Sequence, residues 1–510
     1  MAREFVGVQR GQMLLMPPSL SEWLPEDHLV WTVLGAVDQM DLGRFRTAYR
    51  LGGAGRAPYD PAVLVALLLY SYARGIRSSR HIERACHEDV AFKIIANQRT
   101  PDHSTIAEFR RRHELEIADL FDDVLGLCGE VGLVSVGVIA IDGTKIKANA
   151  CMDANRDYRQ IAIEILREAE ETDRREDELY GDRRGDELPE QLRTPEGRRA
   201  ALEEAKRRIV ERKARREAGE IEPKDVGVEV DPGRMSGRGG RREWVREGRR
   251  ELERQREQRR RPIPQERTDR LFEAARRLEE NEAVELAVHR TYEQWRQTAR
   301  DTKGRRLGGP TTPYQPPALP AGQINLSDPD SRVMRTQGSP PHQSYNAQAA
   351  VNENQVILAA EITVDPPDFG HLEPMLNITL AHLTRHGVDQ LPETVVADAG
   401  YWHQRQMHSI TARGIQVLVP PDGGMRDSPR PGWENGLYDQ MRRKLATESG
   451  RALYGLRKIT IEPVYGQIKH NRGVTRFMRR GRAAVQSEWR LITASHNLLK
   501  LHNHWIANTA

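Results

Sequence analysis

The stretch VSVGVIAIDG, residues Val134–Gly143, decides the class of fold. Its apolar positions are mainly valine and isoleucine, whose β-branched side chains favour a buried strand. The run ends in Asp142, so we predict a strand that carries a carboxylate at its C-terminal tip. Proteins that combine strands with helices place their functional sites at that end of the strands.

A second acid follows a second apolar strand in the same way. TVVA, residues Thr394–Ala397, leads directly into Asp398. Alternating and amphipathic patterns predict a hairpin, two helices and one more strand nearby, at residues 344–364, 371–387, 403–414 and 415–421. Strands that alternate with helices after a hairpin predict a mixed sheet with flanking helices, in the α/β or α+β class.

A third acid, Glu462, lies in the segment TIEPVYGQIKH. Thr460 can cap a helix and Pro463 is tolerated in a first turn, so we predict that Glu462 stands at the start of a helical region from about 460 to 503. Lys469 comes two turns later on the same face. Three carboxylates without a His/Cys cluster prefer hard cations such as Mg²⁺ or Mn²⁺.

The first 133 residues are expected to form an all-α domain. Asp60 can cap a helix that continues through the apolar run at residues 62–74 and stops at Gly75. A later helix carries three consecutive arginines, which could line a face for DNA phosphates or form a solvated charged face: Arg110, Arg111 and Arg112.

Residues 155–323 are expected to be a charged insertion, largely helical or disordered, that ends in a Pro/Gly-rich connector at Leu307–Gln323. Its most basic part, Gly233–Arg261, has 12 arginines and 5 glutamates. Such a run can bind a polyanion by releasing counterions. The other interpretation is a solvated linker with long, fraying helices.

The composition excludes several classes of protein. The 510 residues are 38% hydrophobic and 30% charged, with a net charge of +4 and a mean hydropathy of −0.68. The longest apolar runs are too short to cross a bilayer, and the first residues lack the apolar core of a signal peptide. Three cysteines without a CxxC pair argue against disulfides and zinc. We therefore expect a cytoplasmic protein with no membrane partner.

Three blocks of sequence resemble the catalytic blocks of bacterial insertion-sequence DDE transposases, at Ile141–Ala150, Val395–Trp402 and Ile461–Lys469. The likeness is strongest to group eleven-eighty-two, related to the insertion-sequence four and five families. It implies an RNase H-like catalytic domain with a mixed five-stranded sheet, formed by residues 134–154 and 324–510. It also implies that residues 1–133 bind DNA and that the insertion lies between the first two strands.

The resemblance implies a role for each acid. Asp142, Asp398 and Glu462 would be the catalytic residues and would hold two Mg²⁺ or Mn²⁺ ions. Related families often have an arginine four residues before the glutamate and a tyrosine three residues before that arginine. Here Lys458 occupies the arginine's place, so either Lys458 substitutes for it or Arg457 reaches the site, and the tyrosine would be Tyr454.

The same resemblance implies the partners. The chain would bind double-stranded DNA, both the element ends and the target, as a homodimer associated with the bacterial nucleoid. The expected DNA contacts are Lys469, Lys458, Arg457, Arg472, Arg476, Arg479, Arg480, Arg110, Arg111 and Arg112.

Side chains near the acids leave further alternatives open. His371 and His403 could transfer protons, but capping and packing roles are favoured. Trp402 and Trp433 could stack on an unpaired base, but roles in a core or loop are favoured. Two other functions remain possible for the whole chain: a catalytically inactive, repressor-like DNA-binding protein, and an RNase H-like nuclease that does not transpose.

Overall fold

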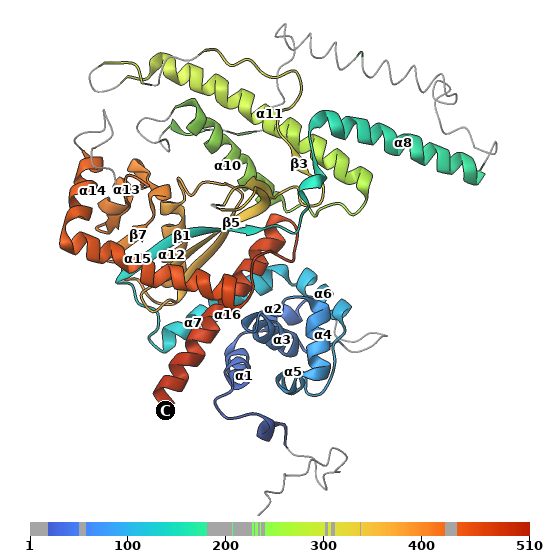
Figure 1. Cartoon of the computed structure of the whole chain (residues 1–510), viewed down its shortest axis with the longest axis vertical. Helices are drawn as coiled ribbons and strands as arrows, with labels where there is room; N and C mark the ends of the chain where they lie inside the picture. Colours follow the sequence, from blue (N-terminus) through green and yellow to red (C-terminus); the bar gives the residue numbers. More distant parts are fainter. Residues whose placement is uncertain are drawn as a thin grey trace, which may run out of the picture. The chain divides into compact units, whose positions relative to one another are not determined.

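The computed structural model divides the chain into two compact units (Figure 1). It describes residues 19–49, 58–180, 240–300, 304–307, 312–336, 338–423 and 436–509, with a few isolated positions between 207 and 235. One unit, here called the helical unit, comprises Met1–Val134, Gln467–Gly473 and Arg490–Ala510. The other, here called the sheet unit, comprises Ser135–Gly466 and Val474–Trp489.

In its described residues up to 133, the helical unit contains helices and no strand. Helix α3 is buried along most of its length, as its apolar sequence predicts, and Asp60 caps it by accepting a hydrogen bond from Ala62 N at 2.9 Å. Gly75 ends it with a φ of 77°. The helices are α1 (Leu29–Gln39), α2 (Gly43–Arg46), α3 (Pro61–Ala73), α4 (Ser79–Glu88), α5 (Val90–Ile95), α6 (His103–Arg112) and α7 (Glu114–Glu130), after a 3-10 turn at Leu20–Trp23.

The end of the chain completes the helical unit. Helix α16 (Arg482–Thr509) contributes its second half, in which Asn497 O accepts a hydrogen bond from the Cys128 thiol of α7. His502 bonds the Thr32 hydroxyl of α1 at 2.8 Å. These contacts join the last helix of the chain to α1 and α7.

The sheet unit is built on a six-stranded mixed sheet, with one strand more than the sequence predicts. Its order is β4-β5-β1-β7-β8, and β6 also pairs with β5. The extra strand, β4, has only three residues, too few to give a pattern that sequence inspection detects. The strands are β1 (Val138–Lys147), β4 (Arg332–Met334), β5 (His342–Asn352), β6 (Ile357–Thr363), β7 (Thr394–Ala397) and β8 (Gln416–Leu418).

The pairing confirms the predicted hairpin and corrects the first strand. β5 and β6 are antiparallel around a turn in which Gln355 has a φ of 60°. β1 does not end at Asp142 but continues to Lys147, because the long β5 pairs with it along its whole length. The parallel pairing of β1 with β7, however, stops at Ile141.

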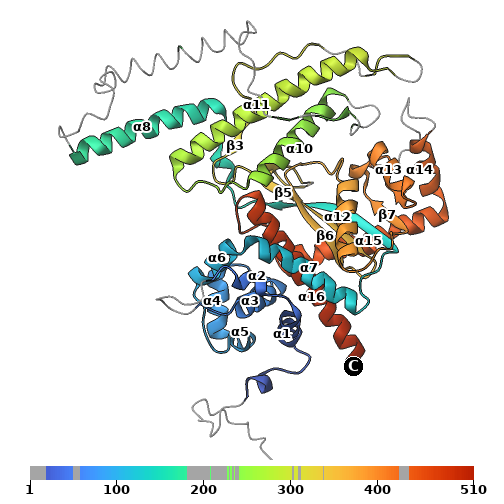
Figure 2. The same ribbon diagram turned by 180° about the vertical axis from the view of Figure 1, so that it is seen from behind.

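Helices cover the sheet. α12 packs on β5 and β6 (Figure 2), and α15 packs on β1, β5 and β7. The predicted helices at 371–387 and 403–414 are confirmed as α12 and α13. The helices after β6 are α12 (Leu372–Arg385), the 3-10 turn η6 (Ala399–Tyr401), α13 (Gln404–Ala412), α14 (Leu437–Ala446) and α15 (Glu448–Gly466), which runs into the π-turn η7 (Gln467–Asn471).

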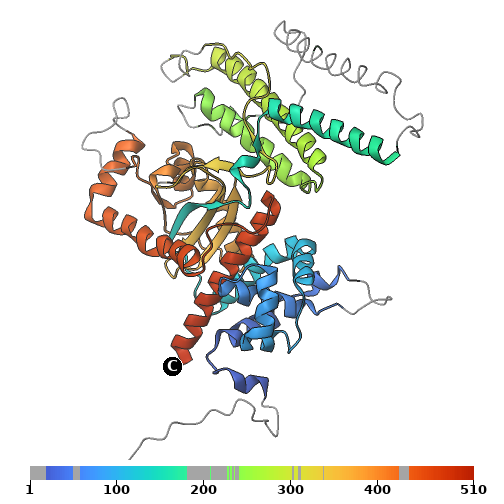
Figure 3. The ribbon, with the colours of Figure 1, turned by 45° about the vertical axis from the view of Figure 1, so that its right-hand side comes forward.

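The described part of the charged insertion has a small core of its own. After β2 (Asn155–Arg156), which pairs with β3 (Ile324–Asn325), come α8 (Tyr158–Tyr180), α10 (Arg241–Arg259) and α11 (Arg267–Thr298). Figure 3 shows α10 and α11 side by side, and Trp244 and Tyr292 are buried between them. The basic run Gly233–Arg261 therefore forms a packed helix from residue 241 onward, while most of its first residues lie outside the described part.

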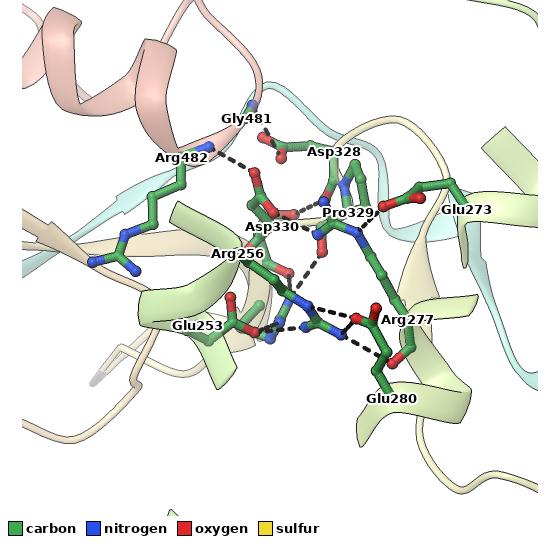
Figure 4. A network of polar contacts seen from close by, with 12 residues as sticks. Glu253, Arg256, Glu273, Arg277, Glu280, Asp328, Pro329, Asp330, Gly481 and Arg482 are labelled. Atoms are coloured by element: carbon green, nitrogen blue, oxygen red, sulfur yellow. Dashed lines mark hydrogen bonds and ion pairs between the residues drawn. The ribbon is translucent and has the colours of Figure 1, made fainter. Parts of the chain in front are cut away.

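Ion pairs connect this insertion to the sheet. Arg277 of α11 pairs with Glu273 and with Asp330, which precedes β4, and Arg256 of α10 pairs with Glu280 of α11 and with Glu253 (Figure 4). Glu253 also accepts a hydrogen bond from Arg332 of β4 at 2.7 Å. Arg256 and Arg277 are almost fully buried, so removing one partner would leave an uncompensated charge.

Two expectations from composition can be compared with the structure. None of the helices in the described part of the chain is long and apolar enough to cross a membrane. The three cysteines are free, and burial raises the pKa of the Cys86 and Cys128 thiols to about 12. Two of the three are therefore inert at neutral pH.

Candidate active site

Strand pairing brings the first two acids together. Ile141 and Ala397 are partners in the parallel β1–β7 pair, so Asp142 and Asp398 follow at the same level on neighbouring strands. Burial raises the pKa of Asp142 to about 6, and repulsion from Asp398 adds to the effect. Burial also raises the pKa of Asp398. Two carboxylates are thus held in a place that disfavours their charged forms.

Arg457 links the third acid to the first. From α15 it donates one hydrogen bond to Asp142 Oδ2 at 2.9 Å and another to Glu462 Oε1 at 3.1 Å. Of the two cations considered from the sequence, Arg457 therefore reaches the acids, whereas Lys458 is exposed. Tyr454 is hydrogen-bonded to Arg457; burial raises the pKa of Tyr454 and the arginine opposes that change.

The prediction that Glu462 stands at a helix start is wrong. Helix α15 begins at Glu448, and Pro463 lies inside it. A proline in a helix leaves the carbonyl four residues earlier without its usual donor. Here that carbonyl, Ile459 O, accepts a hydrogen bond from Gln355 Nε2 in the β5–β6 turn at 2.9 Å. A side chain from another element thus replaces the missing backbone donor.

A fourth acid, Asp368, lies next to the site and was missed from the sequence. Lys145 Nζ lies 3.0 Å from Asp368 Oδ2, and the Asn346 and Gln348 amides donate to Asp368 Oδ1 at 2.7 and 2.8 Å. The charge of Asp368 raises the pKa of Asp398, second to burial. In the sequence Asp368 belongs to DPPD, residues 365–368, which follows β6, but four residues separate Asp368 from the end of that strand, whereas Asp398 follows β7 directly.

Close packing explains a glycine beside Asp142. A Cβ on Gly143 would collide with Gln348 Nε2 and Asp368 Oδ1. Two tyrosines complete the framework: Tyr465 donates to Asp142 O at 2.6 Å, and the Tyr401 hydroxyl donates to Gln348 Oε1. Both tyrosines are largely buried, and burial raises the pKa of each well above its usual range. They act as neutral donors at physiological pH.

The donor set partly fits the predicted metal ions. Asp142 and Asp398 are two neighbouring, buried carboxylates whose pKa values are raised. When both are ionised their negative charges repel, and a divalent cation bound between them would relieve that repulsion. In the described residues, however, no three His, Cys, Asp or Glu side chains gather closely enough to hold a metal. The guanidinium of Arg457 lies between Asp142 and Glu462 instead.

The basic residues predicted to bind DNA differ in their surroundings. Arg110 donates to Tyr72, Ser79 and Arg77 O inside the helical unit, and Arg472 is buried and donates to Ile492 O at 3.1 Å. Arg111 and Arg112 pair with Glu108. Lys469 is partly buried in η7, in the part of the chain assigned to the helical unit.

Three other arginines lie on a segment attached to β1. Phe477 N donates to Lys147 O at 2.8 Å, and Lys147 N donates to Thr475 O at 3.2 Å. Arg480 donates to Asn149 O at 2.9 Å. The segment therefore follows the strand that carries Asp142, and its arginines are Arg476, Arg479 and Arg480.

The histidines and tryptophan near the acids have packing contacts. His403 is buried and caps α13, and the centre of its ring lies 4.9 Å from the centre of the Phe369 ring. The Nε2 atom of His371 lies 3.4 Å from Asp365 Oδ2. Trp402 packs edge-on against Tyr438. Trp433 is outside the described residues.

Family models match two segments of the chain, one near each end. Residues 18–112 match a family model described as a transposase domain, and residues 428–502 match one described as a transposase DDE domain. The second match covers Arg457 and Glu462. Comparison with curated proteins and with solved structures gave no match. The two matches support an insertion-sequence DDE transposase, and a DDE domain suggests an enzyme that cuts and transfers DNA.

Proposed function

We propose that this chain is the transposase of an insertion sequence of group eleven-eighty-two, which binds the element's terminal inverted repeats, cleaves there and joins the ends to target DNA. One observation carries the proposal: Asp142 and Asp398 lie side by side on β1 and β7, and Arg457 connects Asp142 to Glu462. The two transposase matches support it independently. A homodimer that holds two ends together, associated with the bacterial nucleoid, belongs to the same proposal.

Asp142, Asp398 and Glu462 are the proposed metal ligands of an RNase H-like centre. Held there, two Mg²⁺ or Mn²⁺ ions would supply Lewis-acid stabilisation of the phosphodiester oxygens and lower the pKa of bound water. In the first reaction, water attacks phosphorus and a DNA 3′ oxygen leaves, taking a proton. In the second, that freed 3′ hydroxyl attacks a target phosphodiester and displaces its 3′ oxygen.

Arg457 has a proposed role before and during the reaction. Without a cation it balances the charges of Asp142 and Glu462. If bound cations neutralised those acids, the guanidinium would be available to a DNA phosphate, which it would recognise through paired donors. Tyr454 restricts the positions that Arg457 adopts.

The proposed DNA contacts follow from exposure and position. Arg476, Arg479 and Arg480 lie on the segment beside β1, where phosphates near the acids would pass. Lys458 is exposed on the helix that carries Glu462. Lys469, Arg111 and Arg112 remain proposed contacts, whereas we assign Arg110 and Arg472 structural roles because their guanidinium groups bond inside the fold.

The test is nicking of a duplex that contains the element's end. The parent protein should nick at the end in the presence of Mg²⁺ and not in EDTA, and Asp142→Asn should abolish nicking. Asp389→Asn, which changes an exposed carboxylate between α12 and β7, is the control and should nick as the parent does. An Asp142→Asn protein that nicks normally would refute the catalytic assignment. Cleavage of hybrids or hairpins without preference for ends would instead indicate a nuclease that does not transpose.

A further inference from the structure

Helix α10 of the insertion contacts a loop of the sheet unit through Arg250. Its guanidinium pairs with the Asp365 carboxylate and also donates to the carbonyl oxygen of Phe369. Both charged side chains are largely shielded, with exposed fractions of 16% and 17%. Because Arg250 bonds both a carboxylate and a backbone carbonyl of the same loop, it restricts both the position and the orientation of that loop.

A second arginine on the same helix adds to this contact. Arg246, one turn before Arg250, stands over the Phe369 ring with its guanidinium carbon 5.2 Å from the ring centre. Gly370 has a φ of 84°, and a Cβ there would collide with the Arg250 guanidinium. Any other residue at position 370 would therefore have a strained backbone and would crowd the Arg250 guanidinium.

The middle of the same loop, between the two residues that Arg250 contacts, lies next to the acids. Asp368, three residues after Asp365, bonds Lys145 of β1 and the Asn346 and Gln348 amides of β5. Gln348 in turn accepts a hydrogen bond from Tyr401, in the turn that begins at Asp398. A continuous set of contacts thus joins α10, through residues 365–371, to the strand ends that carry the acids.

We propose that Arg250 is a positioning residue for catalysis, by which the charged insertion holds the 365–371 loop, and with it Asp368, against the acid cluster. The expected effect on catalysis rests on the proposed function, whereas the contact between Arg250 and the 365–371 loop does not depend on it. It assigns the insertion a role in shaping the site in addition to any contact with DNA. Residues that orient an acid site from outside typically change activity 10- to 100-fold when removed.

The first measurement does not depend on the protein cleaving DNA. Hydrogen exchange of backbone amides is followed in the metal-free, full-length protein for the parent and for Arg250→Met. Exchange should accelerate in residues 365–371 and in the turn at 399–401. The matched control is Arg249→Met, because Arg249 is the neighbouring residue on α10, is exposed and pairs with Glu285 of α11 instead. Its exchange in both segments should equal that of the parent.

The second measurement is nicking of the end-containing duplex. Arg250→Met should lower kcat about tenfold with little change in KM for DNA, because the shielded Arg250 guanidinium is bonded to the 365–371 loop. Arg250→Lys keeps the charge and should recover part of the rate. Arg249→Met should behave as the parent.

The outcomes separate the two proposals. A parent protein that never nicks would refute the proposed function, while accelerated exchange in Arg250→Met would still support the link from α10 to the loop. Unchanged exchange at 365–371 in Arg250→Met would overturn the inference, whatever the activity. If Arg250→Met fails to fold, Arg250→Lys takes its place, and unchanged exchange in that variant overturns the inference as well.

Discussion

Asp142 is the residue on which most of the site depends. Its carboxylate is shielded by the fold, bonded to Arg457 and close to Asp398, and its pKa is raised to about 6. A carboxylate whose pKa is higher in the folded state than in the unfolded chain favours folding when protonated and opposes it when ionised. At neutral pH the ionised Asp142 therefore lowers the free energy of unfolding of the metal-free protein, and bound cations would offset that cost.

The first prediction concerns Asp142→Asn in EDTA. The stabilising effect of the Asp142 proton is complete below about pH 4 and lost as pH rises through about 6, so above that pH the ionised side chain costs roughly 1–3 kcal/mol. Asp142→Asn should therefore raise the Tm relative to the parent at pH 8, and the difference should vanish at pH 4. Thermal scans at both pH values measure it, with Asp389→Asn as control; an equal difference at both pH values would contradict the assignment.

The second prediction separates two neighbouring cations. Arg457→Met leaves Asp142 and Glu462 without their shared partner and should lower the metal-free free energy of unfolding by about 2 kcal/mol. Mg²⁺ should restore part of the loss by neutralising the acids. Lys458→Met, one position along the same helix but exposed, should change stability by less than about 0.5 kcal/mol. Urea titrations with and without Mg²⁺ give these values, and equal effects of the two substitutions would argue against the bridging role of Arg457.

At the scale of single residues, part of the site could be predicted from the sequence. Asp142 and Asp398 could be found because each follows a short apolar strand, and strand ends are where such sheets carry chemistry. Asp368 could not be selected in the same way, since four residues, two of them prolines, separate it from the end of β6. Its partners Lys145 and Gln348 come from other parts of the chain. The choice between Arg457 and Lys458 needed the direction of each side chain on the helix.

Elements were predicted well where one pattern dominated and poorly where two signals competed. The β5–β6 hairpin and helix α12 follow the expected boundaries closely. Helix α15 does not, because Thr460 and Pro463 resemble a helix start although the helix began at Glu448. Strand β1 was predicted to end too early, because its continuous apolar run stops at Ile141, whereas the pairing with β5 extends the strand to Lys147.

The third prediction tests how α15 accommodates its proline. Gln355→Met removes the donor to Ile459 O and should cost about 0.5–1 kcal/mol. In a Pro463→Ala background the same substitution should cost less, because the alanine amide supplies the helical hydrogen bond instead. Unfolding free energies of the four proteins form a double-mutant cycle, and a coupling of zero would show that the Gln355 contact does not replace the missing donor.

At the scale of the whole molecule, the prediction from amino-acid composition was least accurate for the charged insertion, whose described part has a core of its own. Its described helices bury Trp244 and connect to the sheet by the shielded ion pairs Arg277–Asp330 and Arg332–Glu253, so a segment with few apolar residues still packs. Composition reports how much core a segment can form alone, but not the core it shares with another part of the chain. The association of the last helix with the first ones was likewise not encoded in any local pattern.

The fourth prediction concerns binding of the whole chain to DNA. Arg476→Ala should weaken binding to all sequences alike and reduce the slope of log affinity against log salt concentration by about 0.9, the value for one lost phosphate contact. Arg472→Ala should instead lower the Tm, because Arg472 is buried in the helical unit. Filter binding at several salt concentrations provides the slopes, and an unchanged slope for Arg476→Ala would exclude a phosphate contact there.

The most direct test of the central claim is anomalous scattering from crystals of the protein with its DNA end and Mn²⁺. We expect Mn²⁺ within about 2.2 Å of carboxylate oxygens of Asp142, Asp398 and Glu462, at two positions about 4 Å apart, with Arg457 released from the acids. Crystals that contain DNA and Mn²⁺ but show no anomalous peak there, with Arg457 still bridging Asp142 and Glu462, would contradict it.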